Sequence, residues 1–562
     1  MQKVNYEQKL ENLKTDEEAD FRYQERRHEE WKENYQLNRD KVTVNRITQR
    51  QSVNIPLMKG TLKTILANID EFPAIEFEEQ GNDKQKEIFL NSYWDHFVTK
   101  DKLEIKDIVD KKQELLYGKT WRKLNISYGR PTSEVREPFD ILVDRFSDPS
   151  DIETSHHLID CNIFRTLDQL EANPNYDKAA IRRLKAYYGT AQGLIKAEEV
   201  TKLMQAKNER LGEMGVPDIN NPALGHTVVE LRVYYVKIWD ALDQQDHIHV
   251  IVRCGTETLM AKPLKEILNI DFYPFITWSS DPERNDHYPD GTADIVRTPN
   301  KVLNVWFSQL VENRALRNMG MNFYDATAKE GWVPQSFDPV PFGWYPLPGK
   351  PSEVYQKVDI PDLSESLDEI AFVKGLVESS TAATATTKGE TDNNKVTLGE
   401  VELTVQAAKE RISSISKFYM LAQKEFGDKW AKLVNANPDK IEAVKLYKKG
   451  YRGNMYGRTV VPTDWKSEDG YSCKVVSSTE REQKDLMTIQ KLNAIKQEFI
   501  GNPAFKKIYD KRLLEFGGLN PDESKEVMDF AEQNPMPMHV DQNGQPIQSV
   551  TPPINVPTPQ FA

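Results

Sequence analysis

The sequence predicts a mainly helical α+β protein, and two patterns carry that prediction. Between 363 and 437, a helix, a polar loop and a much longer helix follow one another, with apolar residues in steps of three and four. Two strand-like runs, Thr227–Trp239 and His247–Arg253, are rich in Val, Ile and Tyr, residues that favour strands. A chain of 562 residues that contains both patterns is expected to hold several domain-sized units.

Composition and charge narrow the classes of function. The formal net charge is −13, which argues against a dedicated basic face for wrapping nucleic acid but not against DNA that passes close by. The three cysteines form no CxxC pair, so a disulfide framework is not expected and a reducing compartment is favoured. The chain starts without an apolar signal-like stretch, and no apolar run approaches the roughly 18 residues of a membrane span. Neither secretion nor a membrane partner is expected.

The first half of the chain reads as a charged, aromatic helical segment followed by an α+β body. Residues 1–52 should form a helical arm that either lies on its own domain or reaches a neighbour. The elements expected after it are a short helix ending near Asp70, a helix at Asp101–Tyr117, strands at Trp121–Tyr128 and Phe139–Phe146, helices between Asn162 and Lys202, and the two strands named above.

In the middle of the chain, a proline-rich stretch is flanked by two helices. Thr298 is expected to cap the first helix, with Pro299 at its first position, and the helix should stop near Gly320. Between 321 and 362 the prolines are too frequent for helix interiors, which predicts a compact β or loop module at the tip of a helical stalk.

Two capping boxes mark the helices that come next. Ser366 precedes Glu369 by three residues, and Thr397 precedes Glu400 by three. The loop between them, 384–397, is polar, and the second helix should be a rod of roughly 50 Å at about 1.5 Å per residue. Strands are expected at Glu442–Tyr447 and Ser472–Val476, around a Gly- and Tyr-rich turn at 450–453, and helices within 478–534. The proline-rich tail, 535–562, should be disordered or bind as an extended segment.

Motifs that could carry catalysis are incomplete. Gly118-Lys119-Thr120 resembles the end of a phosphate-binding loop, but Gln113 stands where that motif needs glycine. His247 and His249 share one strand face, yet Asp246 should point to the opposite face and no other ligand completes a metal site, so a core or surface histidine pair is favoured. The acids at 144, 148, 151 and 153 fit a solvated turn. We therefore predict no enzymatic activity, no cofactor and no metal.

Taken together, the parts and their order resemble the portal (head–tail connector) proteins of tailed bacteriophages, most closely the short-tailed-phage type. The similarity covers most of residues 20–530. The stretches that carry it are Asn45–Leu57, Leu115–Thr120, Phe139–Asp144, Phe272–Phe275, Tyr288–Asp294 and the helix Pro299–Asn313.

The resemblance implies a protomer with named parts in chain order. They are an N-terminal helical arm (1–52), an α+β wing (53–297), a stem helix (298–320), a clip (321–362), a second stem helix (363–383), a tunnel loop (384–397), a long wing helix (398–437), a wing β segment (438–477), a helical crown (478–534) and a flexible tail (535–562).

The resemblance also implies a function. Such proteins form a ring, usually of twelve copies, at one capsid vertex, where double-stranded DNA is packaged and later ejected. The implied partners are the terminase large subunit, head–tail adaptor or neck proteins, and the major capsid and scaffolding proteins. The protein would be made in the cytoplasm of the bacterial host and end in the virion.

Two sets of residues are candidates for contact. The tunnel-loop set should line the DNA channel and consists of Lys388, Asn393, Asn394 and Lys395. Its lysines either touch phosphates in a salt-sensitive way or only keep the loop soluble. The clip set should lie in contacts with other subunits or partners and consists of Trp332, Phe342, Trp344 and Tyr345. Two alternatives stay open: another structural virion protein, such as a head–tail adaptor, and a DNA-packaging enzyme.

Overall fold

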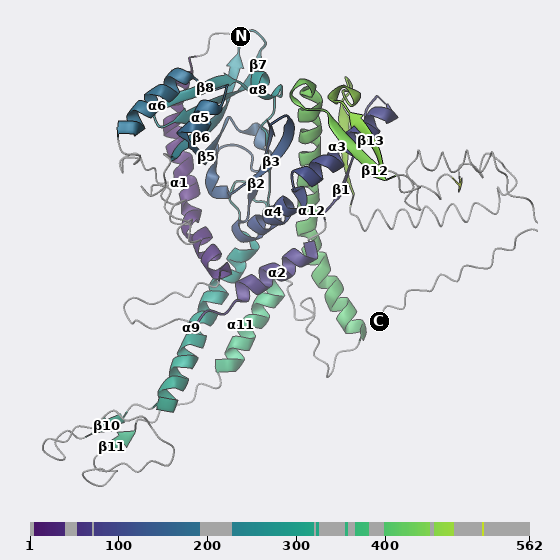
Figure 1. Ribbon diagram of the computed structural model, residues 1–562. Helices are drawn as coiled ribbons and strands as arrows, with labels where there is room; N and C mark the ends of the chain where they lie inside the picture. Colours follow the sequence, from purple (N-terminus) through teal and green to yellow (C-terminus); the bar gives the residue numbers. More distant parts are fainter. Residues whose placement is uncertain are drawn as a thin grey trace, which may run out of the picture. The chain divides into compact units, whose positions relative to one another are not determined.

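The structure is a computed structural model, and it forms two compact units (Figure 1). Residues Met1–Ala443 and Val461–Val475 make up the first, and Val444–Val460 with Val476–Ala562 make up the second. The residues whose structure is described are 5–39, 53–69, 72–81, 83–190, 228–319, 322–324, 355–357, 366–381, 398–449, 455–476 and 509–510.

Helices supply most of the first unit. They are α1 (Tyr6–Asn38), α2 (Leu57–Ile69), α3 (Lys84–Lys100), α4 (Leu103–Tyr117), α5 (Leu167–Ala172), α6 (Lys178–Thr190), α8 (Leu264–Leu268), α9 (Thr292–Met319), α11 (Ser366–Thr381) and α12 (Leu398–Ala436). Single 3-10 turns lie at Pro138–Asp140, Ile152–Thr154, Pro438–Lys440 and Pro462–Asp464.

The strands form several small sheets. A five-stranded sheet has the order β4-β5-β6-β7-β8, a three-stranded sheet has the order β3-β2-β9, and β1 pairs with β14. Their bounds are β1 (Ala74–Glu79), β2 (Thr120–Ser127), β3 (Arg130–Arg136), β4 (Ile141–Val143), β5 (His157–Thr166), β6 (Val228–Asp240), β7 (Gln245–Cys254), β8 (Glu257–Pro263), β9 (Phe275–Trp278) and β14 (Tyr471–Val476).

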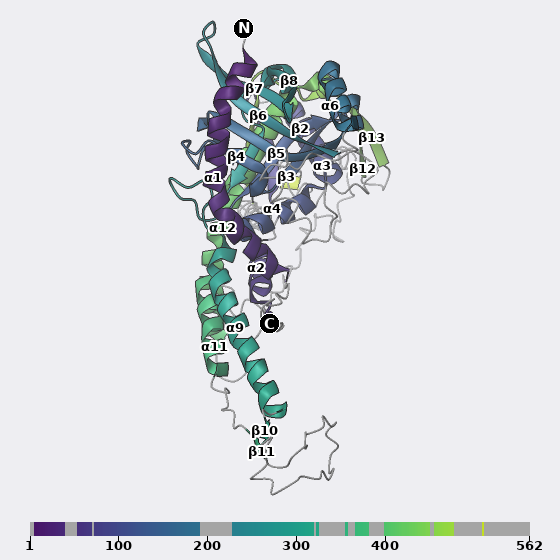
Figure 2. The ribbon, with the colours of Figure 1, turned by 90° about the vertical axis from the view of Figure 1, so that its left-hand side faces the viewer.

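Helix α1 lies across the five-stranded sheet of its own chain (Figure 2). Leu10 and Leu13 are buried against a core that includes Tyr234, Val236 and Ile251 of the central strands. Burial of apolar area at about 25 cal/mol per Å² stabilises this contact. Of the two alternatives for the N-terminal segment, the structure therefore shows the helix laid on its own domain.

A buried ion network joins α4, the three-stranded sheet and α12. Arg122 of β2 lies 2.9 Å from Asp110 and 3.2 Å from Asp107, and Lys111 lies 2.8 Å from Asp107. The Tyr419 hydroxyl of α12 donates a hydrogen bond to the Asp107 carboxylate. Since a buried charge is stable only when it is paired, these residues fix α12 against the body.

An aromatic cluster holds the last turns of α12. Trp430 stacks on Phe77 of β1 at 5.3 Å between ring centroids and meets Trp94 of α3 edge-on at 4.8 Å. Tyr93 stacks on Trp465 at 4.5 Å. Aromatic pairs at these spacings stabilise a core beyond their buried area.

Helices α9 and α11 form an antiparallel pair that extends away from the sheets (Figures 1 and 2). Ile370 and Val377 of α11 are buried in a core shared with α2, α4 and α9. Beyond the pair, β10 (Asn322–Tyr324) and β11 (Tyr355–Lys357) run antiparallel, with Asn322 opposite Lys357. The chain between the two helices thus leaves and returns at one place.

In the second unit, β12 (Val444–Lys449) and β13 (Met455–Val460) form an antiparallel hairpin with Val444 opposite Val460. The sequence predicts a strand at Glu442–Tyr447, which is confirmed as β12 with its bounds two residues later. The turn expected at 450–453 lies outside the described residues, and β13 was not predicted. The predicted strand at Ser472–Val476 is β14, which pairs with β1 in the first unit instead.

The prediction for the start of α9 was wrong. The helix begins at Thr292, and Pro299 lies inside it. The Asp294 carboxylate accepts a hydrogen bond from the Gly291 amide at 2.8 Å and caps the helix about two turns earlier than predicted, and Ala293 and Val296 are fully buried. Proline is tolerated because the carbonyl it leaves free belongs to Ile295, which is exposed.

Other elements were missed or misplaced. Strand β5 runs to Thr166, so the helical stretch expected from Asn162 begins only with α5 at Leu167. Its residues 157–162 are buried without alternation, as in a central strand covered on both faces. The run Phe139–Phe146 holds only the short strand β4 after a 3-10 turn. Five further elements, β1, α3, β3, β8 and β9, were not predicted from the sequence.

Candidate functional site

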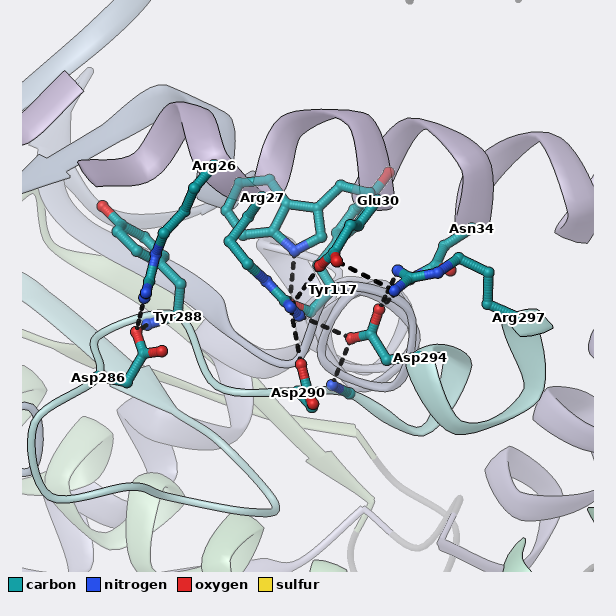
Figure 3. Close-up of polar contacts among 12 residues, drawn as sticks. Arg26, Arg27, Glu30, Asn34, Tyr117, Asp286, Tyr288, Asp290, Asp294 and Arg297 are labelled. Carbon is teal, nitrogen blue, oxygen red and sulfur yellow. Dashed lines mark hydrogen bonds and ion pairs between the residues drawn. The ribbon is translucent and has the colours of Figure 1, made fainter. Parts of the chain in front are cut away.

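The α9–α11 pair begins at a junction that we call the helix-pair base (Figure 3). It consists of Arg27, Trp31 and Asn34 of α1, Tyr117 and Gly118 at the end of α4, and the segment Tyr288–Asp294 that starts α9. The junction sets the orientation of the helix pair relative to the sheets, so its geometry bears on any function of the pair.

Trp31 is the apolar centre of the helix-pair base. It is fully buried, and its indole Nε1 donates a hydrogen bond to the Tyr117 carbonyl at 3.0 Å. Its ring meets Phe139 edge-on at 4.9 Å and Tyr288 at 5.6 Å between centroids. One side chain therefore binds α1 to the end of α4, to the turn before β4 and to the loop before α9.

Gly118 lets two backbones touch. It ends α4 in the left-handed region, with φ of +78°, and a Cβ there would lie 2.1 Å from the Pro289 carbonyl oxygen. Only glycine fits both the angle and the contact. The stretch that resembles a phosphate-binding loop is thus a helix end packed on another loop.

Lys119 in that stretch is buried. Its ammonium group lies 5.3 Å from the centre of the Trp121 ring, and burial lowers its pKa to about 8. A phosphate-binding lysine must reach solvent and ligand, and this side chain faces the protein core.

Asp294 is the polar centre of the helix-pair base (Figure 3). Its side chain is 5% exposed and forms ion pairs with Arg27 at 2.8 Å and Arg297 at 2.6 Å. The carboxylate also accepts hydrogen bonds from the Asn34 side-chain amide at 2.9 Å and from the Gly291 backbone amide. Side chains of α1 and α9 thereby converge on the first turn of α9.

The charges around Arg27 compensate one another. Burial alone would lower the pKa of Arg27, but the carboxylates of Asp294, Glu30 and Asp290 raise it, so the guanidinium stays charged. Glu30, Asp290 and Asp294 lie close enough together to bind a metal ion. Arg27, 2.7 Å from Asp290, already occupies the position of such a cation.

A polar ladder on α9 holds the segment before α2. The Asn300, Asn304 and Ser308 side chains accept hydrogen bonds from the backbone amides of Met58, Ile55 and Val53, each at 2.8 to 2.9 Å. Residues four apart lie on one helix face, so an extended strand of chain can run along them.

The helix pair also presents an apolar surface. Apolar side chains exposed by 43 to 72% are Ile295, Val305 and Val311 on α9 and Leu367, Phe372 and Leu376 on α11. Phe372 and Leu376 are four residues apart and therefore share one side of α11, and we call this pair the apolar stem face. Apolar groups that cluster on one projecting element are typical of an interaction surface.

The residues predicted as contact sites lie outside the described residues. This holds for the tunnel-loop set, Lys388, Asn393, Asn394 and Lys395, and for the clip set, Trp332, Phe342, Trp344 and Tyr345. Both assignments stay predictions.

The acids near 150 form turns, as expected. Asp144, Asp148 and Asp151 each accept the backbone amide two residues later, at 2.8 to 3.0 Å. Glu153 instead reaches Lys429 of α12 at 2.8 Å. Three of the four acids are therefore turn residues and the fourth anchors a helix.

The histidine pair divides into two cases. His249 is buried, and its Nδ1 lies 3.1 Å from the Tyr6 hydroxyl, so it is a satisfied core histidine. His247 is also buried, but Asp240 and Asp243 lie beside it. Neither acid is adjacent to the histidine in sequence: Asp240 ends β6, Asp243 lies in the turn, and the hairpin brings both near His247.

Sequence reasoning missed the helix-pair base as a site. Arg27 and Asp294 are far apart in the chain, and nothing local pairs them. The spacing of Asn300, Asn304 and Ser308 was a usable signal, since polar residues four apart on an otherwise apolar helix indicate a specific polar contact.

The charged side chains of the helix-pair base pair with one another, so the base acts as a structural joint that orients the helix pair. No helix among the described residues is long and apolar enough to span a membrane. The class that emerges is a structural protein with a projecting helix hairpin.

The chain belongs to a family of phage portal proteins. A match to the family described as Phage SU10 portal protein covers residues 7–549 of 562. The predicted resemblance to portal proteins of short-tailed phages is confirmed. No curated protein matches the chain.

Proposed function

We propose that this protein assembles into a closed ring at one capsid vertex and that the ring is the channel for packaging and ejecting double-stranded DNA. The family supports a structural portal role. In the proposal, the terminase large subunit docks first and head–tail adaptor proteins later, while capsid and scaffolding proteins surround the ring.

The apolar stem face is the observation that carries the proposal. Ile370 and Val377 turn one side of α11 into the core, while Phe372 on another side is 72% exposed. Exposing a phenylalanine on a projecting helix is unfavourable in an isolated chain. A head-to-tail contact between copies, repeated until the ring closes, would cover it on every copy.

Assembly is tested with untagged full-length protein by mass photometry and electron microscopy. We expect closed rings for the natural sequence and a loss of rings for Phe372→Asp, because the new carboxylate would be buried without a partner. Lys374→Asp, at an exposed position of the same helix, is the matched control and should still form rings. Compact monomers alone for the natural sequence at micromolar concentration would contradict the proposal.

The DNA contact is proposed for residues 384–397. Its support is the polar composition of that stretch, two lysines among acids, and its place between α11 and α12. Each copy carries a net charge of −13, so a wall of such copies repels DNA on average and contacts with phosphates should be few and salt-sensitive.

A deletion separates assembly from DNA handling. Removing Thr386–Asn393 should leave rings intact and impair packaging or retention of DNA, measured by nuclease protection in an in vitro packaging reaction. Replacing Lys388 and Lys395 by Ala should give a milder defect that grows with salt concentration. Normal packaging by the deletion variant would contradict the channel assignment. For the clip, Trp344→Ala should weaken ring closure or adaptor docking more than it lowers the melting temperature.

A further inference from the structure

We propose that the turn between β6 and β7 binds a divalent metal ion of the zinc type through Asp240, Asp243 and His247. Nothing in the portal assignment requires this site, and its test does not depend on ring assembly or DNA.

The hairpin places the three side chains together. Asp240 ends β6 opposite Gln245, and His247 lies opposite Ile238. Positions two apart on a strand share a face, so Asp240 and His247 are diagonal neighbours on one face. Asp243 comes from the turn itself. One ligand atom from each residue lies within 4.8 Å of the other two.

His247 is the observation that points to a ligand. Its side chain is 7% exposed, and both ring nitrogens are buried without a hydrogen-bond partner. Nε2 lies 3.4 Å from the Asp243 carboxylate and Nδ1 lies 3.7 Å from Asp271, and neither contact has hydrogen-bond geometry. Buried polar groups normally have a partner, so a partner for Nε2 is expected.

The spacing suits a metal ion. With zinc–nitrogen and zinc–oxygen bonds of about 2.0–2.2 Å, neighbouring ligand atoms of a tetrahedral site lie roughly 3.3–3.6 Å apart. The 3.4 Å between His247 Nε2 and Asp243 Oδ2 falls in that range. A carboxylate that faces the other ring nitrogen, as Asp271 does here, is the usual outer partner of a metal-binding histidine.

The cluster around His247 differs from the acidic group in the helix-pair base in how its carboxylate charges are compensated. There, Arg27 and Arg297 neutralise the carboxylates. Within the part of the chain that the structure describes, Asp240 and Asp243 form no ion pair with lysine or arginine, and Asp240 is only 8% exposed. Two carboxylates and one imidazole leave a net negative site, which a divalent cation would balance.

The ligand types of Asp240, Asp243 and His247 limit which metal ion can bind. One imidazole and two carboxylates favour zinc or a neighbouring divalent transition metal over calcium, which prefers six or more oxygen ligands. Three protein ligands leave one position for water. Because all three come from one hairpin, the ion would stiffen the β6–β7 turn.

The test uses untagged full-length protein stripped of metal with a chelator and then titrated with Zn²⁺, followed by isothermal calorimetry and elemental analysis. We expect one tightly bound Zn²⁺ per chain. His247→Ala should abolish it, and Asp243→Asn should weaken it by about tenfold or more.

Two controls make the result specific. Asp246→Asn removes an exposed acid of the same hairpin that lies opposite Trp239, on the other face, and should bind like the natural sequence. His156→Ala removes an exposed histidine and should do the same. If His247→Ala does not fold, Asp243→Asn decides, since Asp243 is exposed. Absence of stoichiometric Zn²⁺ in the natural sequence, or undiminished binding by Asp243→Asn, would overturn the proposal.

Discussion

Gly118 and Gly291 pack backbone against backbone: a Cβ on Gly291 would lie 2.5 Å from the Gly118 amide nitrogen. Neither position has room for a side chain. The end of α4 therefore sits directly on the loop that starts α9, and the direction of the α9–α11 pair follows from this contact.

Gly118→Ala should destabilise the protein by more than about 2 kcal/mol. The left-handed angle alone costs roughly 1–2 kcal/mol for a residue with a Cβ, and the added methyl would meet the Pro289 carbonyl. Urea unfolding followed by tryptophan fluorescence measures the change. Gly60→Ala is the matched control: Gly60 lies in α2 with no atom near its absent Cβ, so alanine should be neutral or stabilising by about 0.5–1 kcal/mol. Equal effects of the two substitutions would contradict the contact.

Arg27→Ala should destabilise the helix-pair base by about 3–5 kcal/mol, because it leaves Asp294 with a buried charge and one cation fewer. Hydrogen exchange should accelerate over 292–300, the first turns of α9. Arg22→Ala tests the same residue type on the same helix. Its side chain is 77% exposed and 4.0 Å from Glu18, so the expected change is within about 0.5 kcal/mol. Unchanged exchange at 292–300 in the Arg27 variant would show that α1 does not hold α9.

Asn300→Ala should release the segment before α2. Asn300 is fully buried and accepts the Met58 amide at 2.9 Å, so its loss should cost about 1–3 kcal/mol. We expect faster amide exchange at 53–58 with little change in α1. Asn68→Ala, which removes an exposed asparagine at the end of α2, should leave that segment protected. Exchange that is the same in both variants would argue against the ladder on α9.

Glu114 should make stability depend on pH. Burial raises its pKa to about 7 from an ordinary value of 4.5. The folded state then keeps the proton that the unfolded chain loses, so the stabilising contribution is complete below pH 4.5 and declines as pH rises to about 7. Each unit of difference corresponds to about 1.4 kcal/mol.

Glu114→Gln should remove this dependence. The amide oxygen can still accept the Ser280 amide, which lies 2.7 Å from the carboxylate in the natural protein. Melting temperatures between pH 4.5 and 7.5 should therefore fall less steeply with rising pH in the variant. Glu104→Gln, at an exposed position of the same helix, should keep the natural slope. Parallel curves for all three proteins would contradict a neutral, buried Glu114.

Elements whose signals are local could be predicted from the amino-acid sequence. Helices α11 and α12 lie within the predicted ranges, because apolar spacing and capping act between residues three or four apart. Strands β6 and β7 followed from their Val, Ile and Tyr content. The family followed from the order of the parts along the chain, which no single contact decides.

How distant segments meet depends on contacts that form only in the folded chain. A charged helix such as α1 carries few apolar residues, so its sequence cannot tell a free arm from a helix packed on a sheet until Leu10, Leu13 and Trp31 find their partners. The early start of α9 depends on Asp294, whose carboxylate is held by Arg27 from another helix. Asp240 and Asp243 reach His247 only because the hairpin register fixes which face each residue takes. Burial and strand register bring together residues far apart in the chain, and these contacts cannot be inferred from the local spacing of residues.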